Sequence, residues 1–400
     1  MGTVAVIGAS LAGFKVAQEL RRLGNEDTIV LVGSEHHLPY DRPPLSKGLL
    51  AGTVATETLH FADAQALAGL DLDLRLGEFV REVDLDARRL RTASGMTLAF
   101  DTLVIAAGTR PRRMPAFEEL SQVHQLRTLD DALALRESLS SINRLAIVGG
   151  GLIGGEVAAT GRKLGVEVTL IDVVSRPFHR TLGERVGSLI EGQHRDMGVV
   201  FVCGAPIIDV TGHATPEAIR LANDRVVEAD AVLVGIGVVP NTEFLRETDL
   251  DITDGILCDF TGRCGPGVWA VGDIARWRDP QTGVARRFEH WSNAVEQART
   301  VAWNIANPDD GARRGTSGIP YFWTDQYDSK VQMFGIPADD DEFVLLSRNS
   351  EMHNRLSGVF CRDGQVRAGV TVNSIREVPV VRKHVMERTP VEQLNGRTEE

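Results

Sequence analysis

The chain has 400 residues, more than one hydrophobic core normally organises, so we expect two or three domains. Its composition, 43% hydrophobic and 24% charged, is ordinary for a soluble globular enzyme. The net charge of −12 argues against nucleic acid or an anionic membrane as the main partner, and no apolar stretch approaches the roughly 18 residues that a membrane span needs.

An apolar run over 3–7 has no basic region before it and stops at Gly8. This pattern predicts a first β-strand and not a signal peptide. The chain has no C-x-x-C pair, and its scattered cysteines fit neither a zinc site nor an iron–sulfur cluster. We therefore expect free thiols, no metal and a cytoplasmic location. The cysteines are Cys203, Cys258, Cys264 and Cys361.

The strand over 3–7 leads into a glycine-rich fingerprint at 8–13, and an amphipathic helix follows directly. Such a helix aims its N-terminal N–H groups and positive dipole end at a pyrophosphate, and glycine lets the backbone approach closely. A second strand over 28–32 precedes Glu35, which comes 22 residues after Gly13. That spacing is close to the value of about 20 that is typical of a ribose-binding acid.

The same unit occurs again in the middle of the chain. A strand over 144–148 precedes the glycines of 149–154, and a strand over 167–171 precedes Asp172, which comes 18 residues after Gly154. One fingerprint alone would be weak evidence. Two complete units indicate two bound nucleotides and disfavour the alternative of two glycine turns without a ligand.

Beyond the second unit, glycine and proline mark an exit over 235–241, and a buried strand ends at Gly272-Asp273. A helix is expected over 293–305 and a linker over 307–318. From 355 to 372 apolar and polar residues alternate around Asp363-Gly364, which predicts an antiparallel hairpin. The third domain is therefore expected to be α+β, and the polar residues 395–400 are expected to be frayed.

Taken together and in order, several segments resemble the FAD-dependent, NADH-oxidising ferredoxin reductases of bacterial oxygenase systems, the putidaredoxin reductase type of the two-dinucleotide flavoproteins. The most specific segment is His37–Lys47. The segments that follow it are Ala106–Gly108, the second fingerprint with Glu156, Gly235–Asn241, Val271–Asp273, Glu289–Asn293 and Tyr321–Tyr327.

The resemblance covers nearly the whole chain. It implies an α/β fold with two Rossmann-like dinucleotide-binding domains, for FAD and NAD, and a C-terminal α+β domain. The expected boundaries are 1–112 and 238–318 for the FAD-binding domain, 113–237 for the NAD-binding domain and 319–400 for the C-terminal domain.

The resemblance implies that the first fingerprint binds FAD and that Asp273 binds its ribityl chain, with Trp291 near the isoalloxazine. Locally, Asp273 could equally be a helix N-cap and Trp291 a core residue. Ser10 replaces the middle glycine of the fingerprint, which could loosen FAD binding. The expected FAD contacts are Gly8, Ser10, Leu11, Ala12, Gly13, Glu35, Arg42, Lys47, Ala107, Gly108, Arg127, Asp273 and Trp291.

By the same resemblance, Lys47 and Glu156 pair beside the flavin as the catalytic residues. The lysine ammonium would stabilise the anion formed on reduction, and the glutamate would hold that lysine in position. The alternative is two unrelated solvated side chains.

The second fingerprint is expected to bind NADH, because Asp172 can accept both ribose hydroxyls and would repel a 2′-phosphate. Arg176 could accept that phosphate, or it could be a solvated loop residue. The expected NAD contacts are Gly149, Gly151, Leu152, Ile153, Gly154, Asp172, Arg176, Gly235 and Gly237.

The predicted reaction is electron transfer from NADH through FAD to a separate [2Fe–2S] ferredoxin that supplies a cytochrome P450 or a ring-hydroxylating oxygenase. A rubredoxin or monodehydroascorbate reductase is an alternative, as is an NADH-dependent redox sensor resembling apoptosis-inducing factor. A disulfide reductase or a cysteine-based NADH oxidase would need a redox cysteine near the flavin, and 39–47 contains none. We expect a monomer or homodimer with no nucleic-acid or membrane partner.

Overall fold

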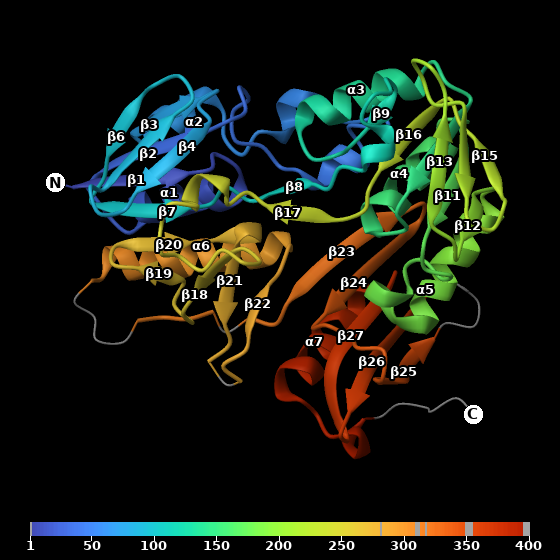
Figure 1. The fold of residues 1–400 in the computed structure, drawn as a ribbon. Helices are drawn as coiled ribbons and strands as arrows, with labels where there is room; N and C mark the ends of the chain where they lie inside the picture. Colours follow the sequence, from blue (N-terminus) through green and yellow to red (C-terminus); the bar gives the residue numbers. More distant parts are fainter. Residues whose placement is uncertain (1, 281, 309–312, 317, 349–354, 395–400) are drawn as a thin grey trace. The chain divides into compact units, whose positions relative to one another are not determined.

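The structure is a computed structural model that describes residues 2–280, 282–308, 313–316, 318–348 and 355–394. The chain divides into two compact units (Figure 1). Unit 1 comprises Met1–Asp41, Glu57–Arg110 and Val239–Pro320, and unit 2 comprises Arg42–Thr56, Pro111–Val238 and Tyr321–Glu400.

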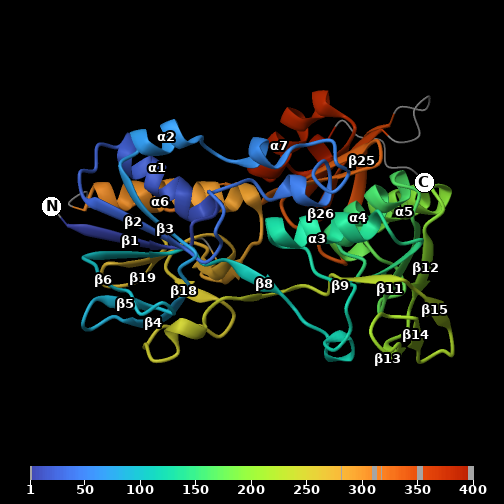
Figure 2. The same ribbon diagram turned by 90° about the horizontal axis from the view of Figure 1, so that it is seen from above.

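Unit 1 is built around a six-stranded sheet with the order β19-β20-β7-β1-β2-β3, in which only β19 is antiparallel to its neighbour. Its four inner strands are almost continuously apolar because helices cover the sheet, and α1 (Leu11–Arg22) packs against α6 (Trp291–Ala306) along it (Figure 2). The strands are β1 (Thr3–Ile7), β2 (Thr28–Gly33), β3 (Leu72–Leu76), β7 (Thr102–Ile105), β19 (Arg263–Gly265) and β20 (Val268–Ala270).

Two smaller three-stranded sheets and short helical turns complete unit 1. One sheet joins β4 (Val80–Asp84), β5 (Arg89–Thr92) and β6 (Thr97–Ala99), and the other joins β18 (Ile256–Cys258), β21 (Ala275–Arg278) and β22 (Ala285–Arg287). The helical turns are η2 (Thr56–Leu59), α2 (Ala64–Gly69), η4 (Glu243–Leu245) and η5 (Gly272–Ile274).

Unit 2 contains a five-stranded sheet with the order β12-β11-β10-β16-β9, in which every neighbouring pair is parallel. Its strands are β9 (Val123–His124), β10 (Arg144–Val148), β11 (Glu167–Asp172), β12 (Val200–Cys203) and β16 (Ala231–Val234). The helical segments of this part are η1 (Pro43–Ser46), η3 (Pro115–Phe117), α3 (Leu129–Leu139), α4 (Leu152–Lys163) and α5 (His179–Asp196). An antiparallel sheet of β13 (Ile207–Thr211), β14 (Ala218–Leu221) and β15 (Val226–Glu228) follows β12.

The last part of unit 2 is an antiparallel five-stranded sheet with the order β23-β24-β27-β26-β25, against which α7 (Val378–Glu387) packs. Its hairpin turns at Asp363-Gly364, where φ is +51° and +70°, as the Asp-Gly pattern predicts. The strands are β23 (Tyr321–Gln326), β24 (Ser329–Phe334), β25 (Glu342–Arg348), β26 (Leu356–Arg362) and β27 (Gln365–Val372), and the helical turns beside α7 are η6 (Ile375–Glu377) and η7 (Val391–Gln393).

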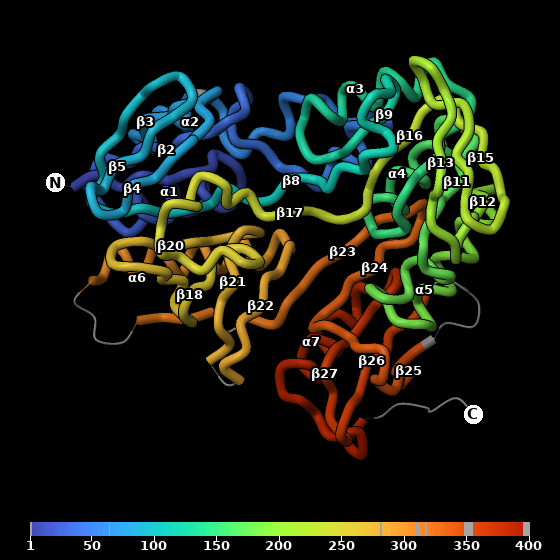
Figure 3. The backbone as a smooth tube through the Cα atoms, viewed as in Figure 1, coloured from blue at the N-terminus to red at the C-terminus, as the bar shows by residue number. Residues whose placement is uncertain are grey.

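The chain leaves unit 1 after β8 (Thr109–Pro111) and returns to it at β17 (Val238–Pro240), a path that can be followed in Figure 3. These two strands form a separate two-stranded sheet. Unit 1 is therefore discontinuous in sequence, and the whole second nucleotide unit lies between its parts.

A hydrophobic core of unit 2 joins its parallel sheet to its C-terminal antiparallel sheet. The core includes Leu145 of β10, Phe178 before α5, and Val331 and Phe360 of the C-terminal strands. Leu50 belongs to the same core and has no exposed surface. Residues 42–56 therefore group with unit 2, whereas the sequence placed them in the FAD-binding domain.

Several predicted elements have the expected bounds, among them the strands over 3–7 and 144–148. Strand β7 ends at Ile105, and Gly108, with φ at +61°, turns the chain three residues later. Helix α6 begins two residues before the predicted Asn293. The predicted linker lies partly outside the described residues, and the tail 395–400 lies wholly outside them. Within the described part of the chain, no helix is long and apolar enough to cross a membrane.

Truncation of Leu50 tests how firmly residues 42–56 are joined to the core of unit 2. We expect Leu50→Ala to lower the free energy of unfolding by about 2–5 kcal/mol, the range for truncating a buried leucine. Denaturant unfolding measures this change. Glu57→Ala, at an exposed position just after the segment, is the control and is expected to have little effect. A cost for Leu50→Ala as small as that of the control would contradict the shared core.

Candidate functional site

The first fingerprint has the close backbone packing that a dinucleotide loop requires. Gly8 has φ at +114°, and a Cβ atom there would lie 2.2 Å from the Ala106 carbonyl oxygen at the end of β7. A Cβ atom on Gly13 would lie 1.9 Å from the Gly8 carbonyl oxygen. Both positions therefore exclude any side chain. Ser10 is the N-cap of α1 with extended backbone angles, so Leu11, Ala12 and Gly13 form the first turn of the helix.

Glu35 lies two residues beyond β2, as the spacing predicts for an acid at the end of the second strand. Its carboxylate accepts a hydrogen bond of 2.5 Å from the hydroxyl of Tyr40, which is only 3% exposed. Tyr40 therefore orients Glu35, and this partner was missed in the sequence.

Asp273 lies inside the turn η5, whose N-cap is Val271, so the alternative of an Asp273 N-cap is not observed. The turn is positioned by Gly272, which has φ at +76° and donates its N–H to the buried Gln297 side chain at 2.8 Å. A Cβ atom on Gly272 would lie 3.0 Å from Cβ of Ala12. Asp273 and the N-terminal turn of α1 are thus neighbours in unit 1.

Trp291 is the first residue of α6 and is 37% exposed, so it is not a core residue. Its indole N–H donates to the Asp41 carboxylate at 2.8 Å. The neighbouring His290 ring stacks on Phe288, and burial lowers the pKa of His290, which favours the neutral imidazole.

Ala107 and Gly108 follow β7 and are tied down by Asn241. The Asn241 side-chain amide donates to the Ala107 carbonyl at 2.8 Å, and its backbone N–H donates to the Gly108 carbonyl at 3.1 Å. Asn241 ends the exit segment that the sequence singled out, but its role in holding the Ala107-Gly108 bend could not be assigned there.

The structure brings Arg42 and Arg127 together in unit 2. The Arg42 guanidinium donates to the Arg127 carbonyl oxygen at 2.6 Å. The backbone N–H of Arg127 donates to Asp131, which also forms the capping box of α3 with Thr128. The two arginines are therefore held side by side at a helix start and are not scattered surface charges.

The second fingerprint repeats the packing of the first. Gly149 has φ at +111°, and a Cβ atom there would lie 2.2 Å from the Gly235 carbonyl oxygen at the end of β16. A Cβ atom on Gly154 would lie 2.3 Å from the Gly149 carbonyl oxygen. Gly151 is the N-cap of α4, whose first turn begins at Leu152 and Ile153. Gly237, with φ at +95°, turns the chain out of β16.

Asp172 is the last residue of β11, and its carboxylate accepts two backbone N–H groups. One bond, of 2.6 Å, comes from Gly150 in the glycine loop, and the other, of 3.0 Å, comes from Val174. A carboxylate has about four lone-pair sites, so it can still accept further hydroxyl groups. The loop bonds fix the acid at the fingerprint.

Arg176 is tied to α5. Its guanidinium donates to Glu184 at 2.8 Å and to the Ser188 hydroxyl at 2.9 Å. The sequence could not show this pairing. Arg176 is thus paired with Glu184 at an exposed position of the loop.

Lys47 and Glu156, which are 109 residues apart in sequence, form an ion pair of 2.8 Å within unit 2. Glu156 lies one turn into α4 and is only 3% exposed. Its Oε2 atom also accepts the Ser46 hydroxyl at 2.5 Å, and its Oε1 atom accepts the Thr324 hydroxyl at 2.6 Å. The carboxylate therefore has the donors that a buried charge needs, and Ser46 and Thr324 were missed in the sequence.

The two glycine loops fit dinucleotide phosphates. In each loop, a Cβ atom on the first or the last glycine would collide with a backbone carbonyl oxygen. The helix that follows presents its N–H groups to the loop, and its N-cap residue forms no side-chain capping hydrogen bond with them. An acid stands at the end of the second strand in both cases. Among the described residues, no cluster of histidine, cysteine or carboxylate side chains could hold a metal ion.

Comparison with known proteins gives two family matches. Residues 2–298 match the pyridine nucleotide-disulphide oxidoreductase family, and residues 321–395 match the reductase C-terminal family. Together they confirm the α/β fold class and the C-terminal domain type that the sequence predicted.

Individual relatives cover almost the whole chain. The ferredoxin–NAD(+) reductase component of the p-cumate 2,3-dioxygenase system of Pseudomonas putida is 37% identical over 97% of this chain and 94% of its own. The ferredoxin reductase for the CYP199A2 system of Rhodopseudomonas palustris has a TM-score of 0.93 at 30% identity, covering 98% and 97% of the two chains. Putidaredoxin reductase in its covalent complex with putidaredoxin has a TM-score of 0.91 at 32% identity, covering 97% and 94%.

The position of Asp172 predicts a preference for NADH over NADPH. Asp172→Ala should raise the Michaelis constant for NADH about ten- to a hundredfold, as expected for losing a hydrogen bond to a charged group. Asp172→Asn removes the negative charge but can still accept the Gly150 N–H. It therefore separates the effect of the charge from the effect of the loop geometry. Steady-state kinetics with both nucleotides measures these effects.

Because Arg176 is paired with Glu184, the gain in NADPH use should be largest when Asp172→Ala is combined with Glu184→Ala. Glu184→Ala alone is the control and should leave the NADH constant unchanged. A wild-type protein that prefers NADPH, or an Asp172→Ala variant that keeps the wild-type preference, would contradict the role of Asp172.

Proposed function

The chain belongs to the pyridine nucleotide-disulphide oxidoreductase family, and from this premise we propose that it passes electrons from NADH through FAD to a [2Fe–2S] ferredoxin. The ferredoxin in turn supplies a cytochrome P450 or a ring-hydroxylating oxygenase. Relatives named for a dioxygenase system, for a CYP system and for putidaredoxin support this function. The enzyme class, the two cofactors and the partner class predicted from the sequence are confirmed at family level.

One observation separates this function from thiol chemistry within the same family. In the segment 39–47, where a disulfide reductase would need its redox cysteine, the chain has Lys47, paired with the buried Glu156. Reactive cysteines need a lowered pKa, because the thiolate is the nucleophile. Here burial raises the pKa of Cys203 and Cys361 to about 11 and also raises the pKa of Cys258.

FAD, when bound, accepts a hydride from NADH and can release the electrons singly. Glu35 would bind the adenosine ribose of FAD, the first fingerprint would bind its pyrophosphate, and Asp273 would bind its ribityl chain. Arg42 and Arg127 would neutralise its phosphates, and Trp291 would stand beside its ring system. The Lys47 ammonium would stabilise negative charge that develops on the cofactor, with Glu156 holding the lysine in place.

The second fingerprint would hold the pyrophosphate of NADH, and Asp172 would bind its adenosine ribose. Gly235 and Gly237 would line the same site, because they lie at the end of β16 beside the loop. We place the reaction in the cytoplasm, where NADH is available and where the four free cysteines would stay reduced.

A turnover assay tests the proposed function directly. The purified protein should release FAD and not FMN on denaturation, because the first site is built for an adenosine dinucleotide. With NADH it should reduce cytochrome c only when a [2Fe–2S] ferredoxin is added. Rubredoxin and monodehydroascorbate are the parallel arms. Recovery of FMN alone, faster turnover with either of those acceptors, or NADH oxidation without any productive protein acceptor would overturn the proposal.

Replacement of the cysteines tests the absence of thiol chemistry. A variant in which Cys203, Cys258, Cys264 and Cys361 are all serine should keep NADH-to-dye electron transfer largely intact, because none of these thiols is expected to react. Cys258 is only 1% exposed, so Cys258→Ala replaces the serine if the variant does not fold. Circular dichroism establishes folding. A folded variant whose flavin is no longer reduced by NADH would show that one thiol takes part.

A further inference from the structure

A continuous chain of hydrogen bonds runs from the Lys47–Glu156 pair into the C-terminal sheet of unit 2. Thr324 donates to Glu156 at 2.6 Å, and the Gln326 amide nitrogen lies 3.1 Å from the Thr324 hydroxyl. The Gln326 amide oxygen lies 2.7 Å from Nε2 of His194, and Nδ1 of His194 lies 3.1 Å from the Tyr327 hydroxyl. Of this chain of hydrogen bonds, the proposed function uses only the Lys47–Glu156 pair.

The inner links of the chain are closed to water. Thr324, Gln326 and His194 have no exposed surface, and Glu156 is 3% exposed. Thr324 and Gln326 are two residues apart on β23, so both side chains project from the same face of the strand. A Cβ atom on Gly155 of α4 would lie 2.6 Å from the Gln326 amide oxygen, so that glycine leaves the space that Gln326 occupies.

The inner end of the chain fixes the direction of every bond. An ionised carboxylate can only accept, so the Thr324 hydroxyl must donate to Glu156. The Thr324 oxygen then accepts from the Gln326 amide N–H, which turns the Gln326 oxygen toward His194. His194 must therefore carry its proton on Nε2, and its Nδ1 atom accepts from the Tyr327 hydroxyl. All donors point toward Glu156.

The surroundings of His194 agree with this direction. Its ring stacks on Phe178 with centroids 5.4 Å apart, and the ring of Phe201 meets it edge-on at 6.2 Å. Burial lowers the pKa of His194 to about 4, so the imidazole is neutral at physiological pH. The titratable and charged groups nearby are Tyr327, whose pKa burial raises, Arg162 beside it, and Arg195, whose guanidinium lies over Phe201.

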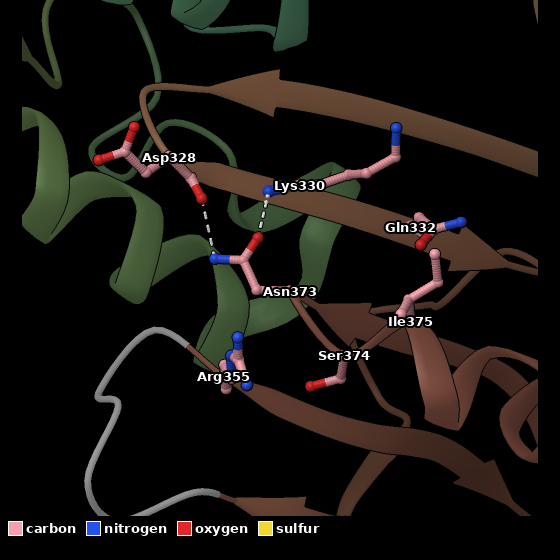
Figure 4. Close-up of a pocket in the computed structure, with 7 residues that line it drawn as sticks. All are labelled: Asp328, Lys330, Gln332, Arg355, Asn373, Ser374 and Ile375. Carbon is pink, nitrogen blue, oxygen red and sulfur yellow. Dashed lines mark hydrogen bonds between the residues drawn. The ribbon is translucent and has the colours of Figure 1, made fainter.

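The outer end of the chain is anchored at the turn between β23 and β24. Tyr327 has φ at +53° in this turn. Figure 4 shows how Asn373 clamps the turn: its side-chain amide donates to the Asp328 carbonyl at 2.9 Å and accepts the Lys330 N–H at 2.8 Å. Asp328 and Lys330 of this turn line a surface pocket. Tyr327 is half-buried, so the hydrogen-bonded chain runs from a partly exposed tyrosine to the buried Glu156 carboxylate.

We propose that Thr324, Gln326 and His194 are positioning residues that fix the Glu156 carboxylate, and through it the Lys47 ammonium. The assignment of Lys47 to the flavin rests on the proposed function, but the hydrogen-bonded chain does not. The C-terminal domain would thus contribute to the electrostatics of the redox site through β23. Hydrogen bonds to a charged group are the strong ones, and aligned bonds in a buried network strengthen one another.

The first test measures the histidine tautomers of the wild-type holoenzyme. Nitrogen NMR of protein labelled at histidine reports the tautomer of each ring, and His194→Gln identifies the His194 signal. We expect His194 at neutral pH to be a single tautomer with its proton on Nε2. An imidazolium, a proton on Nδ1 or a mixture of tautomers would overturn the proposal.

The second test removes one donor. Infrared spectroscopy follows the carboxylic-acid band of Glu156 during a pH titration of the holoenzyme, with Glu156→Gln used to assign the band. In Thr324→Val the pH at which this band appears should move upward by about one to two units, the equivalent of losing one hydrogen bond to a charged group. Thr324→Ser, which keeps the hydroxyl, should restore the wild-type titration.

A matched control exists in the same sheet. Thr371 of β27 is also fully buried, and its hydroxyl has no hydrogen-bond partner within the described part of the chain. Thr371→Val therefore removes a buried strand hydroxyl outside the chain and should leave the band unchanged. An unshifted band in Thr324→Val, or an equal shift in Thr371→Val or Thr324→Ser, would overturn the proposal.

A potentiometric titration links the chain to the cofactor. In Thr324→Val the pH at which the FAD midpoint potential changes slope should move in the same direction as the infrared band. If the band moves and the potential does not, the proposed effect on the redox site is wrong, although the bonds exist. Failure of the ferredoxin assay with normal infrared and NMR results would instead overturn the proposed function.

Discussion

The carboxylate of Glu156 imposes the constraint on which unit 2 depends. A charge that is almost fully removed from water must be met by donors, since leaving it unpaired costs several kcal/mol. Those donors come from chain segments that are distant in sequence: Ser46 and Lys47 from the turn η1, and Thr324 from β23. One buried charge thus ties the segment 42–56 and the C-terminal sheet to helix α4. The apolar core that includes Leu50 joins the same parts.

The two nucleotide folds share a second constraint, which acts on the backbone. In both, the first glycine of the fingerprint packs against a carbonyl oxygen at the end of a neighbouring parallel strand. A Cβ atom on that glycine would lie 2.2 Å from this oxygen in each fold. The last glycine packs in turn against the first. The sheet therefore fixes the position of the loop.

Local patterns were enough to predict the two nucleotide units, because the strand, the glycines and the acid lie within about 35 residues of one another. The pair Lys47–Glu156 was found only through a resemblance, since nothing local connects residues 109 positions apart. The contacts of Asn241 and the chain from Thr324 to His194 were missed for the same reason. A buried threonine and an ordinary strand threonine have the same local sequence signal, and only the packing of β23 on α4 distinguishes them. The pairing of Arg176 with Glu184 was not predicted, because Glu184 lies on the next helix.

The insertion of one nucleotide unit inside the other affects how the chain can fold during translation. Strand β7 pairs on one side with β20, which lies about 160 residues later in the chain. At a synthesis rate of about 5–20 residues per second, β7 waits roughly ten to thirty seconds on the ribosome before that partner emerges. During this interval the first sheet has an open, apolar edge, the feature through which nascent chains aggregate. The parallel sheet of unit 2 emerges complete within the same interval, so it can form before the sheet that starts the sequence is closed by β20.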